Sequence, residues 1–220
     1  MPARATLVDL RKLLAERFPA APPPRSDCLP TGLALLDDAI EGGLPKSAIT
    51  EIASPHVSAG SASLIAALLR RAQHDRYFIA LVDGRDSFDV EPIDNAMLRH
   101  LLWVRCGKAR QAMQAADILL RDGNFPLVIV DLVMNPAAEL RKISQTSWYR
   151  LQRLVESAPT ACLVMTRHTM VSSAQLKIVL ENAWTLNDVD AEEALLQLHF
   201  RVQRSHLQHV DVKEAEAVAV

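Results

Sequence analysis

The sequence has little of three features that define whole classes of protein: cysteine, glycine and long apolar runs. Its 220 residues include 3 cysteines (Cys28, Cys106 and Cys162), which lie far apart and form no C-x-x-C motif. This pattern predicts reduced, buried thiols rather than a disulfide framework. With 7 glycines and no internal repeat, the chain is neither collagen-like nor of low complexity. No apolar run approaches the roughly 20 residues of a membrane helix, so no membrane partner is expected.

An excess of charge of one sign is also missing. The formal net charge of −2 excludes a strongly basic nucleic-acid-binding protein but leaves room for local basic patches. Half of the residues are hydrophobic, which excludes a disordered chain. The first residues carry charges among their leucines, so they are not expected to be a signal peptide. We therefore expect a cytoplasmic protein with one domain, or one domain and a small appendage.

A proline-rich stretch divides the chain. Residues 1–19 contain an amphipathic helix over Thr6–Phe18, and residues 20–28 form a Pro-rich linker. The apolar positions of the helix that we expect to contact a partner are Leu7, Leu10, Leu14 and Phe18. The folded core is expected over 29–207, followed by an acidic flexible tail over 208–220. The N-terminal helix either folds back on its own core or docks on a neighbouring chain.

Within the core, continuous apolar runs alternate with helical patterns. Strands are expected at 48–53, 77–83, 102–106, 127–133 and 161–166. Helices are expected at 61–74, 92–101, 108–121 and 138–157. Because continuous apolar strands separated by helices indicate a sheet covered on both faces, the fold class is α/β with a mainly parallel sheet.

The end of the core has a different pattern. Two apolar segments, Val179–Leu186 and Leu195–Arg204, lie around a turn at Asn187–Asp190. In the second segment apolar and polar residues alternate with a period of two, so one face is expected to be solvated. These segments predict a C-terminal hairpin at the edge of the sheet.

Two strand ends are candidates for a ligand site, because ligands of parallel sheets bind beyond the carboxyl ends of the strands. The first is the segment Ser54–Ser63, between a buried strand and its helix, and the second is Asp131. A phosphate-binding loop at the first place would read G-x-x-x-x-G-K-[ST]. Here Ser54 replaces the leading glycine, Gly60 is present, and Ser61 stands in the lysine position. The segment is also about one residue longer than the motif.

Two interpretations of this segment remain open. It is either a strand-to-helix turn without a ligand, or a weak nucleotide or anion site at the helix N-terminus, with Ser58, Ser61 and Ser63 as donors. Asp131 either orients Mg²⁺ or caps the next helix. The acidic segment from Asp83 to Glu91 lacks the pattern of a calcium loop and is expected to be a solvated loop. We assign no catalytic residue, no metal site and no resident cofactor, and we keep ATP with Mg²⁺ as an alternative.

Basic residues cluster locally in the second half of the chain. The residues that we expect at an interaction surface are Arg150, Arg153, Arg167 and Lys177. They lie on the expected helix over 138–157 and beside the loop from Thr166 to Gln175. Three interpretations are open: an ordinary solvated surface, contact with DNA, and contact with a protein partner.

Several segments in order along the core resemble the RecA family of recombination ATPases, and specifically its ImuA-like branch. They are Leu29–Asp37 with Gly42–Lys46, Ile49–Ile52, Leu81–Gly84 and Leu127–Asp131, and the resemblance spans about residues 29–205. It implies a RecA-like core, in which 127–131 is the Walker B strand. It also places Arg85 where the family has a catalytic glutamate.

The resemblance implies a function as well as a fold. ImuA-like proteins are implicated in mutagenesis induced by DNA damage, beside a Y-family polymerase homologue. We therefore expect a non-catalytic accessory protein of the SOS response, DNA repair and translesion synthesis. Its expected partners are a RecA-like protein or the mutagenesis polymerase complex, with DNA contacted indirectly. The alternatives are an ATPase with a variant phosphate loop and a cell-division inhibitor similar to SulA.

Overall fold

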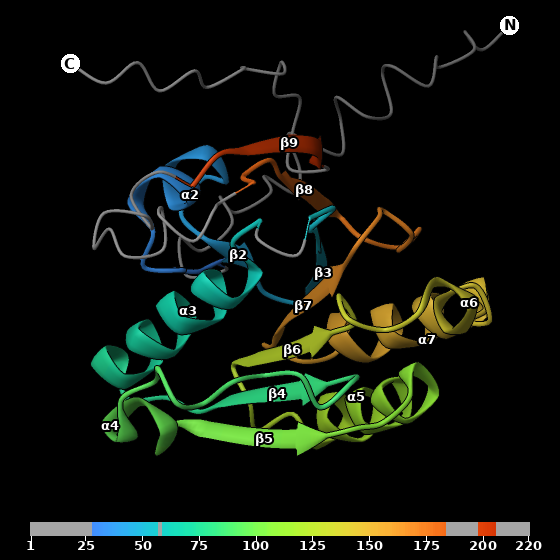
Figure 1. Cartoon of the computed structure of the whole chain (residues 1–220), viewed down its shortest axis with the longest axis horizontal. Helices are drawn as coiled ribbons and strands as arrows, with labels where there is room; N and C mark the ends of the chain where they lie inside the picture. The colour runs from blue at the N-terminus through green and yellow to red at the C-terminus, as the bar shows by residue number, and fades with distance from the viewer. Residues whose placement is uncertain (1–27, 57–58, 184–197, 206–220) are drawn as a thin grey trace, which may run out of the picture.

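A sheet of seven strands forms the centre of the molecule (Figure 1). The structure is a computed structural model and describes residues 28–56, 59–183 and 198–205. The strand order is β5-β4-β6-β7-β3-β8-β9. The bounds are β3 Ala48–Ala53, β4 Ile79–Asp83, β5 Leu101–Arg105, β6 Leu127–Asp131, β7 Ala161–Thr166, β8 Leu176–Leu180 and β9 Phe200–Ser205. Neighbouring strands are parallel except β9, which pairs antiparallel with β8. The expected mainly parallel α/β fold with an edge hairpin is confirmed.

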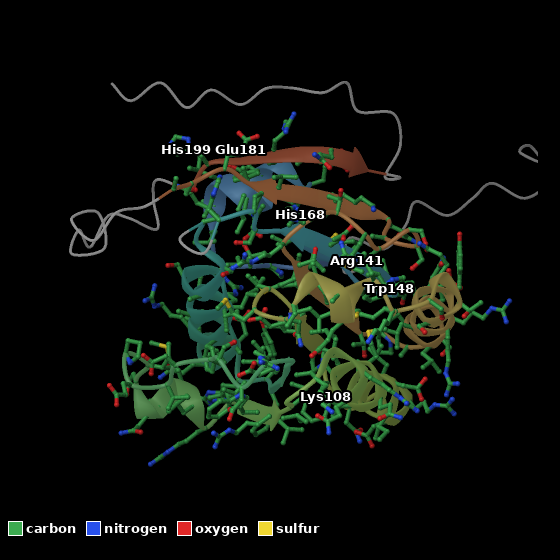
Figure 2. The ribbon with its side chains drawn as sticks, turned by 45° about the vertical axis from the view of Figure 1, so that its right-hand side comes forward. Lys108, Arg141, Trp148, His168, Glu181 and His199 are labelled. Carbon is green, nitrogen blue, oxygen red and sulfur yellow. The ribbon has the colours of Figure 1, made fainter. Side chains whose placement is uncertain are left out.

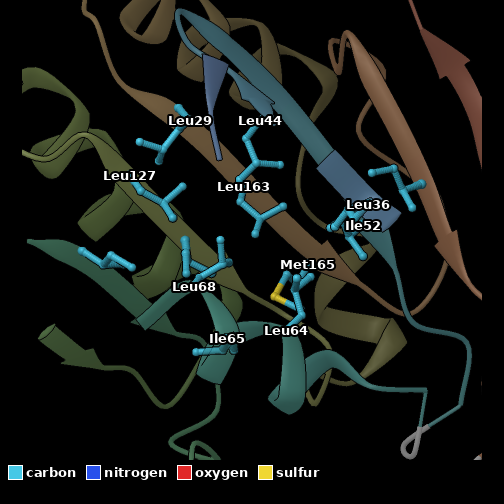
Figure 3. Close-up of a cluster of buried hydrophobic side chains, with 14 of the residues drawn as sticks. Leu29, Leu36, Leu44, Ile52, Leu64, Ile65, Leu68, Leu127, Leu163 and Met165 are labelled. Atoms are coloured by element: carbon cyan, nitrogen blue, oxygen red, sulfur yellow. The ribbon is translucent and has the colours of Figure 1, made fainter. Parts of the chain in front are cut away.

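Helices cover both faces of this sheet, and each face has its own hydrophobic core. On one face α3 (Ser61–Asp75) buries a stripe of leucines against alternate residues of β3, β4, β6 and β7, as Figure 3 shows. On the other face α5 (Ala109–Asp122) and α7 (Gln145–Glu156) pack against the remaining residues of the same strands. Since every residue of β3, β4 and β7 is buried, these strands are mostly apolar on both faces rather than alternating, and the polar residues within β3 are Thr50 and Glu51.

Shorter elements complete the fold. A small antiparallel ladder joins β1 (Cys28–Leu29) to β2 (Leu44–Pro45), and α2 (Ala34–Ala39) lies between them in the chain. Asp37 organises this segment, because its carboxylate accepts hydrogen bonds from the backbone N–H and the hydroxyl of Thr31, both at 2.8 Å. None of the described helices is long and apolar enough to cross a membrane.

The structure differs from the predicted helices in two places. The single helix expected over 138–157 is wrong: α6 (Ala137–Leu140) ends early and α7 begins anew after Ser144. The Ser144 hydroxyl accepts a hydrogen bond from the backbone N–H of Ser147, which is the geometry of an N-cap. The helix expected over 92–101 is reduced to one turn, α4 (Asn95–Leu98), which is capped by Asp94.

The two hairpin strands also have other bounds than the sequence indicated. β8 begins at Leu176 and ends at Leu180, and β9 begins at Phe200. The turn expected at Asn187–Asp190 lies outside the described residues, as do the N-terminal helix, most of the linker and the tail over 208–220. The proposed division of the chain into these four parts therefore stays a prediction.

Candidate functional site

The segment after β3 leads into α3 at the carboxyl edge of the sheet, where a phosphate-binding loop would lie. Ser54 is buried; its backbone N–H donates to the carbonyl of Thr166 at 2.7 Å and its hydroxyl to the carbonyl of His56 at 3.1 Å. Gly60 has φ +98 and is the N-cap residue of α3. Among residues 28–56 and 59–183, no side chain caps this helix end, and its first turn carries no acidic residue. Ser58 lies outside the described residues.

Asp83 and Asp131 occupy the ends of two adjacent strands, β4 and β6, and they are partners in the parallel register. Burial raises the pKa of Asp131 from 3.8 to about 6; the N–H of Val133 opposes the rise and the nearby charge of Asp83 adds to it. The Val133 N–H donates to Asp131 Oδ1 at 2.9 Å. Asp131 therefore caps the turn that follows its strand. It does not cap α6, whose N-cap residue is Pro136.

The Asp83 carboxylate organises the loop that follows β4. Its two oxygens accept hydrogen bonds from the backbone N–H groups of Arg85, Ser87 and Phe88 at 3.2, 2.8 and 2.8 Å. The indole N–H of Trp103 donates to the same carboxylate at 3.3 Å. Asp83 is fully buried, so the prediction of a solvated acidic segment is wrong for this residue. This role could not be predicted from the sequence, because the hydrogen-bond donors lie in a loop and on a separate strand.

Arg85 follows Asp83 and takes the position that the resemblance assigns to a catalytic glutamate. One of its guanidinium nitrogens donates to the carbonyl of Gly107 at 3.1 Å. The same nitrogen lies 3.9 Å from Oε1 of Glu139. Glu139 belongs to α6, and its other carboxylate oxygen accepts from the first N–H of α5, at Ala109. These partners belong to the α5 side of the sheet, whereas α3 lies on the other side. The Arg85 guanidinium therefore contacts Gly107, which precedes α5, and the short helix α6.

A buried asparagine links the loops after β4 and β6. The Asn135 side chain donates to the carbonyl of Gly84 at 2.8 Å, while its own oxygen Oδ1 has no hydrogen-bond partner among the described residues. A Cβ at Gly84 would lie 2.3 Å from this oxygen, so only glycine fits there. At the rim of the same edge, Arg105 holds Asp86 through two hydrogen bonds of 2.5 and 2.8 Å. These contacts fix the loop that carries Arg85.

The four residues that were expected at an interaction surface differ in their partners and exposure. Arg150 makes two hydrogen bonds of 2.6 and 3.0 Å to Asp117 on α5, and Arg153 is exposed one turn further along α7. Arg167 donates to the carbonyl of Val133 at 3.2 Å. The ammonium of Lys177 is turned inward to Glu51, and its side chain is 14% exposed. Lys177 is therefore not part of an accessible basic surface.

The predicted contact residues of the N-terminal helix cannot be placed in the structure. Leu7, Leu10, Leu14 and Phe18 lie outside the described residues. Figure 2 labels His168 on the loop after β7, Arg141 directly after α6, and Trp148 on α7. A hydrogen bond from the Ser172 hydroxyl to Gln145 joins this loop to α7. Within residues 28–56, 59–183 and 198–205, no group of three or more His, Cys, Asp or Glu could hold a metal ion.

A mainly parallel sheet with helices on both faces, a strand-to-helix turn at its carboxyl edge and an aspartate two strands away define a RecA-like α/β core. Comparison with known families agrees: the model of the RecA N-terminal domain matches residues 22–176. The chain therefore belongs to the RecA family.

Individual relatives are named Protein RecA. One from Methylococcus capsulatus is 35% identical over 139 residues, which is 60% of this chain and 40% of that protein. One from Clavibacter michiganensis subsp. michiganensis is 33% identical over 171 residues, which is 74% of this chain and 45% of that protein. The chain thus spans less than half the length of these relatives.

Proposed function

We propose that this chain is a RecA-fold accessory protein that does not hydrolyse ATP. The observation that carries the proposal is the placement of Arg85. A general base must reach the attacking water, and a cation cannot accept its proton. Arg85 is instead engaged by Gly107 and Glu139 on the α5 side of the sheet. The loop that carries it is held by hydrogen bonds to the side chains of Asp83 and Asn135.

The segment between β3 and α3 supports the same conclusion. Ser61 and Ala62 stand in the positions of the lysine and the hydroxyl of a phosphate-binding loop. A charge-assisted hydrogen bond to phosphate contributes roughly 1.5–3 kcal/mol, so losing the lysine lowers nucleotide affinity by more than tenfold. The uncapped N-terminus of α3 and the nearby Asp131 are the features that favour the second candidate, an ATP-binding protein with a variant loop.

Isothermal titration of the full chain with ATP and Mg²⁺ distinguishes the two candidates. The accessory-protein proposal predicts no binding heat at millimolar ATP. Micromolar affinity that is abolished in Asp131→Ala, and retained in the surface variant Arg153→Ala, would establish the ATP-binding candidate instead. Arg153 is a suitable control because it is exposed on α7, on the face of the sheet opposite α3.

The biological setting that we infer is DNA-damage-induced mutagenesis, in which the RecA fold serves as a binding scaffold. Membership of the RecA family and the ImuA-like pattern of the sequence support this inference. The inferred partners are a RecA-like protein or the mutagenesis polymerase complex. The amphipathic pattern over Thr6–Phe18 suits a helix that docks in a partner's groove. A chain lacking residues 1–25 should lose a purified RecA-like or Y-family polymerase partner in a pull-down, and equal retention of both partners would refute the assignment.

A further inference from the structure

Glu51 is a fully buried carboxylate in the middle of strand β3. It belongs to the face of the sheet that packs against α5 and α7, two residues after the core residue Ile49. Burying an ionised group is costly unless it is paired and hydrogen-bonded. A carboxylate is therefore retained at this place only if the surrounding groups offset that cost.

The partners of Glu51 all come from the segment around the loop between β7 and β8. Oε1 accepts hydrogen bonds from the backbone N–H of Met170 at 2.6 Å, the N–H of Val171 at 2.9 Å and the hydroxyl of Thr166 at 3.3 Å. The ammonium of Lys177 lies 2.9 Å from the other oxygen, Oε2. Apart from this ion pair, Oε2 has no hydrogen-bond partner in the described chain.

These contacts join three parts of the chain at one carboxylate. Thr166 ends β7, Met170 and Val171 lie in the middle of the loop, and Lys177 is the register partner of Glu51 on β8. The loop is thus tied at its beginning, its centre and its end. The backbone carbonyl of Thr166 also accepts a hydrogen bond from the backbone N–H of Ser54 at 2.7 Å. This hydrogen bond connects the loop to the start of the segment that leads into α3.

We propose that Glu51 and Lys177 form a conformational clasp that closes loop 167–175 onto the sheet. With the pair intact, the loop has one conformation and presents the exposed residues His168 and Thr169 as a fixed surface. Breaking the pair leaves a charge without a partner in the interior, and moving the loop outward hydrates it. The loop then opens together with the Ser54 end of the neighbouring segment, while β4 and β6 remain closed. This inference does not depend on whether the chain binds ATP.

Native-state hydrogen exchange of the full chain tests the clasp. In Glu51→Gln and in Lys177→Met, exchange at the amides of Met170 and Val171 should accelerate about tenfold or more, with a smaller effect at Ser54. The double variant should recover part of the protection, because a glutamine oxygen still accepts both N–H groups and no lone charge remains. The strand amides of β4 and β6 should not change in any of the three.

A matched control is available on the neighbouring strands. Glu181 and Arg201 form an ion pair of 3.0 Å with side chains 46% and 55% exposed, so Glu181→Gln should leave loop exchange unchanged. Unchanged exchange at Met170 and Val171 in both single variants would overturn the proposal. So would equal acceleration throughout the sheet, because it would mean a general loss of stability rather than local opening. If one single variant does not fold, the double variant is compared with the single variant that does. The proposal requires slower exchange at Met170 and Val171 in the double variant than in that single variant.

Discussion

Replacing Asp131 by asparagine should stabilise the protein at neutral pH. Burial raises the pKa of this carboxyl from 3.8 to about 6, so above pH 6 the folded protein holds a charge that the unfolded chain accommodates more easily. A shift of about two pKa units corresponds to about 3 kcal/mol. Asp131 is only partly buried at the end of β6. We therefore expect Asp131→Asn to raise the free energy of unfolding at pH 7.5 by about 1–3 kcal/mol. Asparagine keeps an oxygen that can accept the Val133 N–H.

The stability difference between Asp131→Asn and the parent protein should depend on pH. The stabilising contribution of a protonated Asp131 is fully present below pH 3.8 and is lost as the pH rises through about 6. The advantage of Asp131→Asn should therefore be largest above pH 6 and shrink towards pH 4. Urea unfolding of both proteins at pH 4.5, 6 and 7.5, followed by circular dichroism, measures it. A variant that is less stable than the parent at pH 7.5, or a difference that does not vary with pH, would refute this reasoning.

Three further substitutions test the packing that fixes the site, each by urea unfolding at pH 7.5. Gly84→Ala should destabilise the fold by about 1–3 kcal/mol, because its Cβ would lie 2.3 Å from Asn135 Oδ1. Asp83→Ala should cost about 2–4 kcal/mol and shift the tryptophan emission, since it removes the acceptor of the β4 loop and of the Trp103 indole. Trp148→Ala should cost about 3–5 kcal/mol, because this side chain is fully buried between α7 and the sheet. If the free energy of unfolding falls by less than about 0.5 kcal/mol in any of these variants, the contact that it removes does not stabilise the fold as described.

The central strands could be predicted from sequence because the physics that places them is local. β3 and β7 coincide with the mostly apolar runs at 48–53 and 161–166, because burial on both faces favours apolar residues along the whole strand. The break between α6 and α7 was missed because the apolar spacing of Leu140 and Leu151 continues in phase across it. The signal that could have revealed it is the N-cap sequence that begins at Ser144.

The partners of charged side chains could not be predicted, because they come from distant parts of the chain. The sequence predicts Lys177 as a surface cation, but its ammonium is paired with Glu51 on the neighbouring strand β3. Arg150 was likewise expected to be available, and it is paired with Asp117 on α5. Glu51 is the single charged residue of the expected strand at 48–53, and this local signal could have indicated a buried ionic contact. By contrast, the position of Asp131 at a strand end followed directly from the apolar run before it.

A measurement of ATP turnover decides whether the RecA fold is present here without ATP hydrolysis. The measurement is release of inorganic phosphate from ATP with Mg²⁺ by the full chain, with and without single-stranded DNA. We expect a rate equal to that of a sample without protein under both conditions. A rate that rises in proportion to protein concentration and disappears in Asp131→Ala would show that the chain hydrolyses ATP.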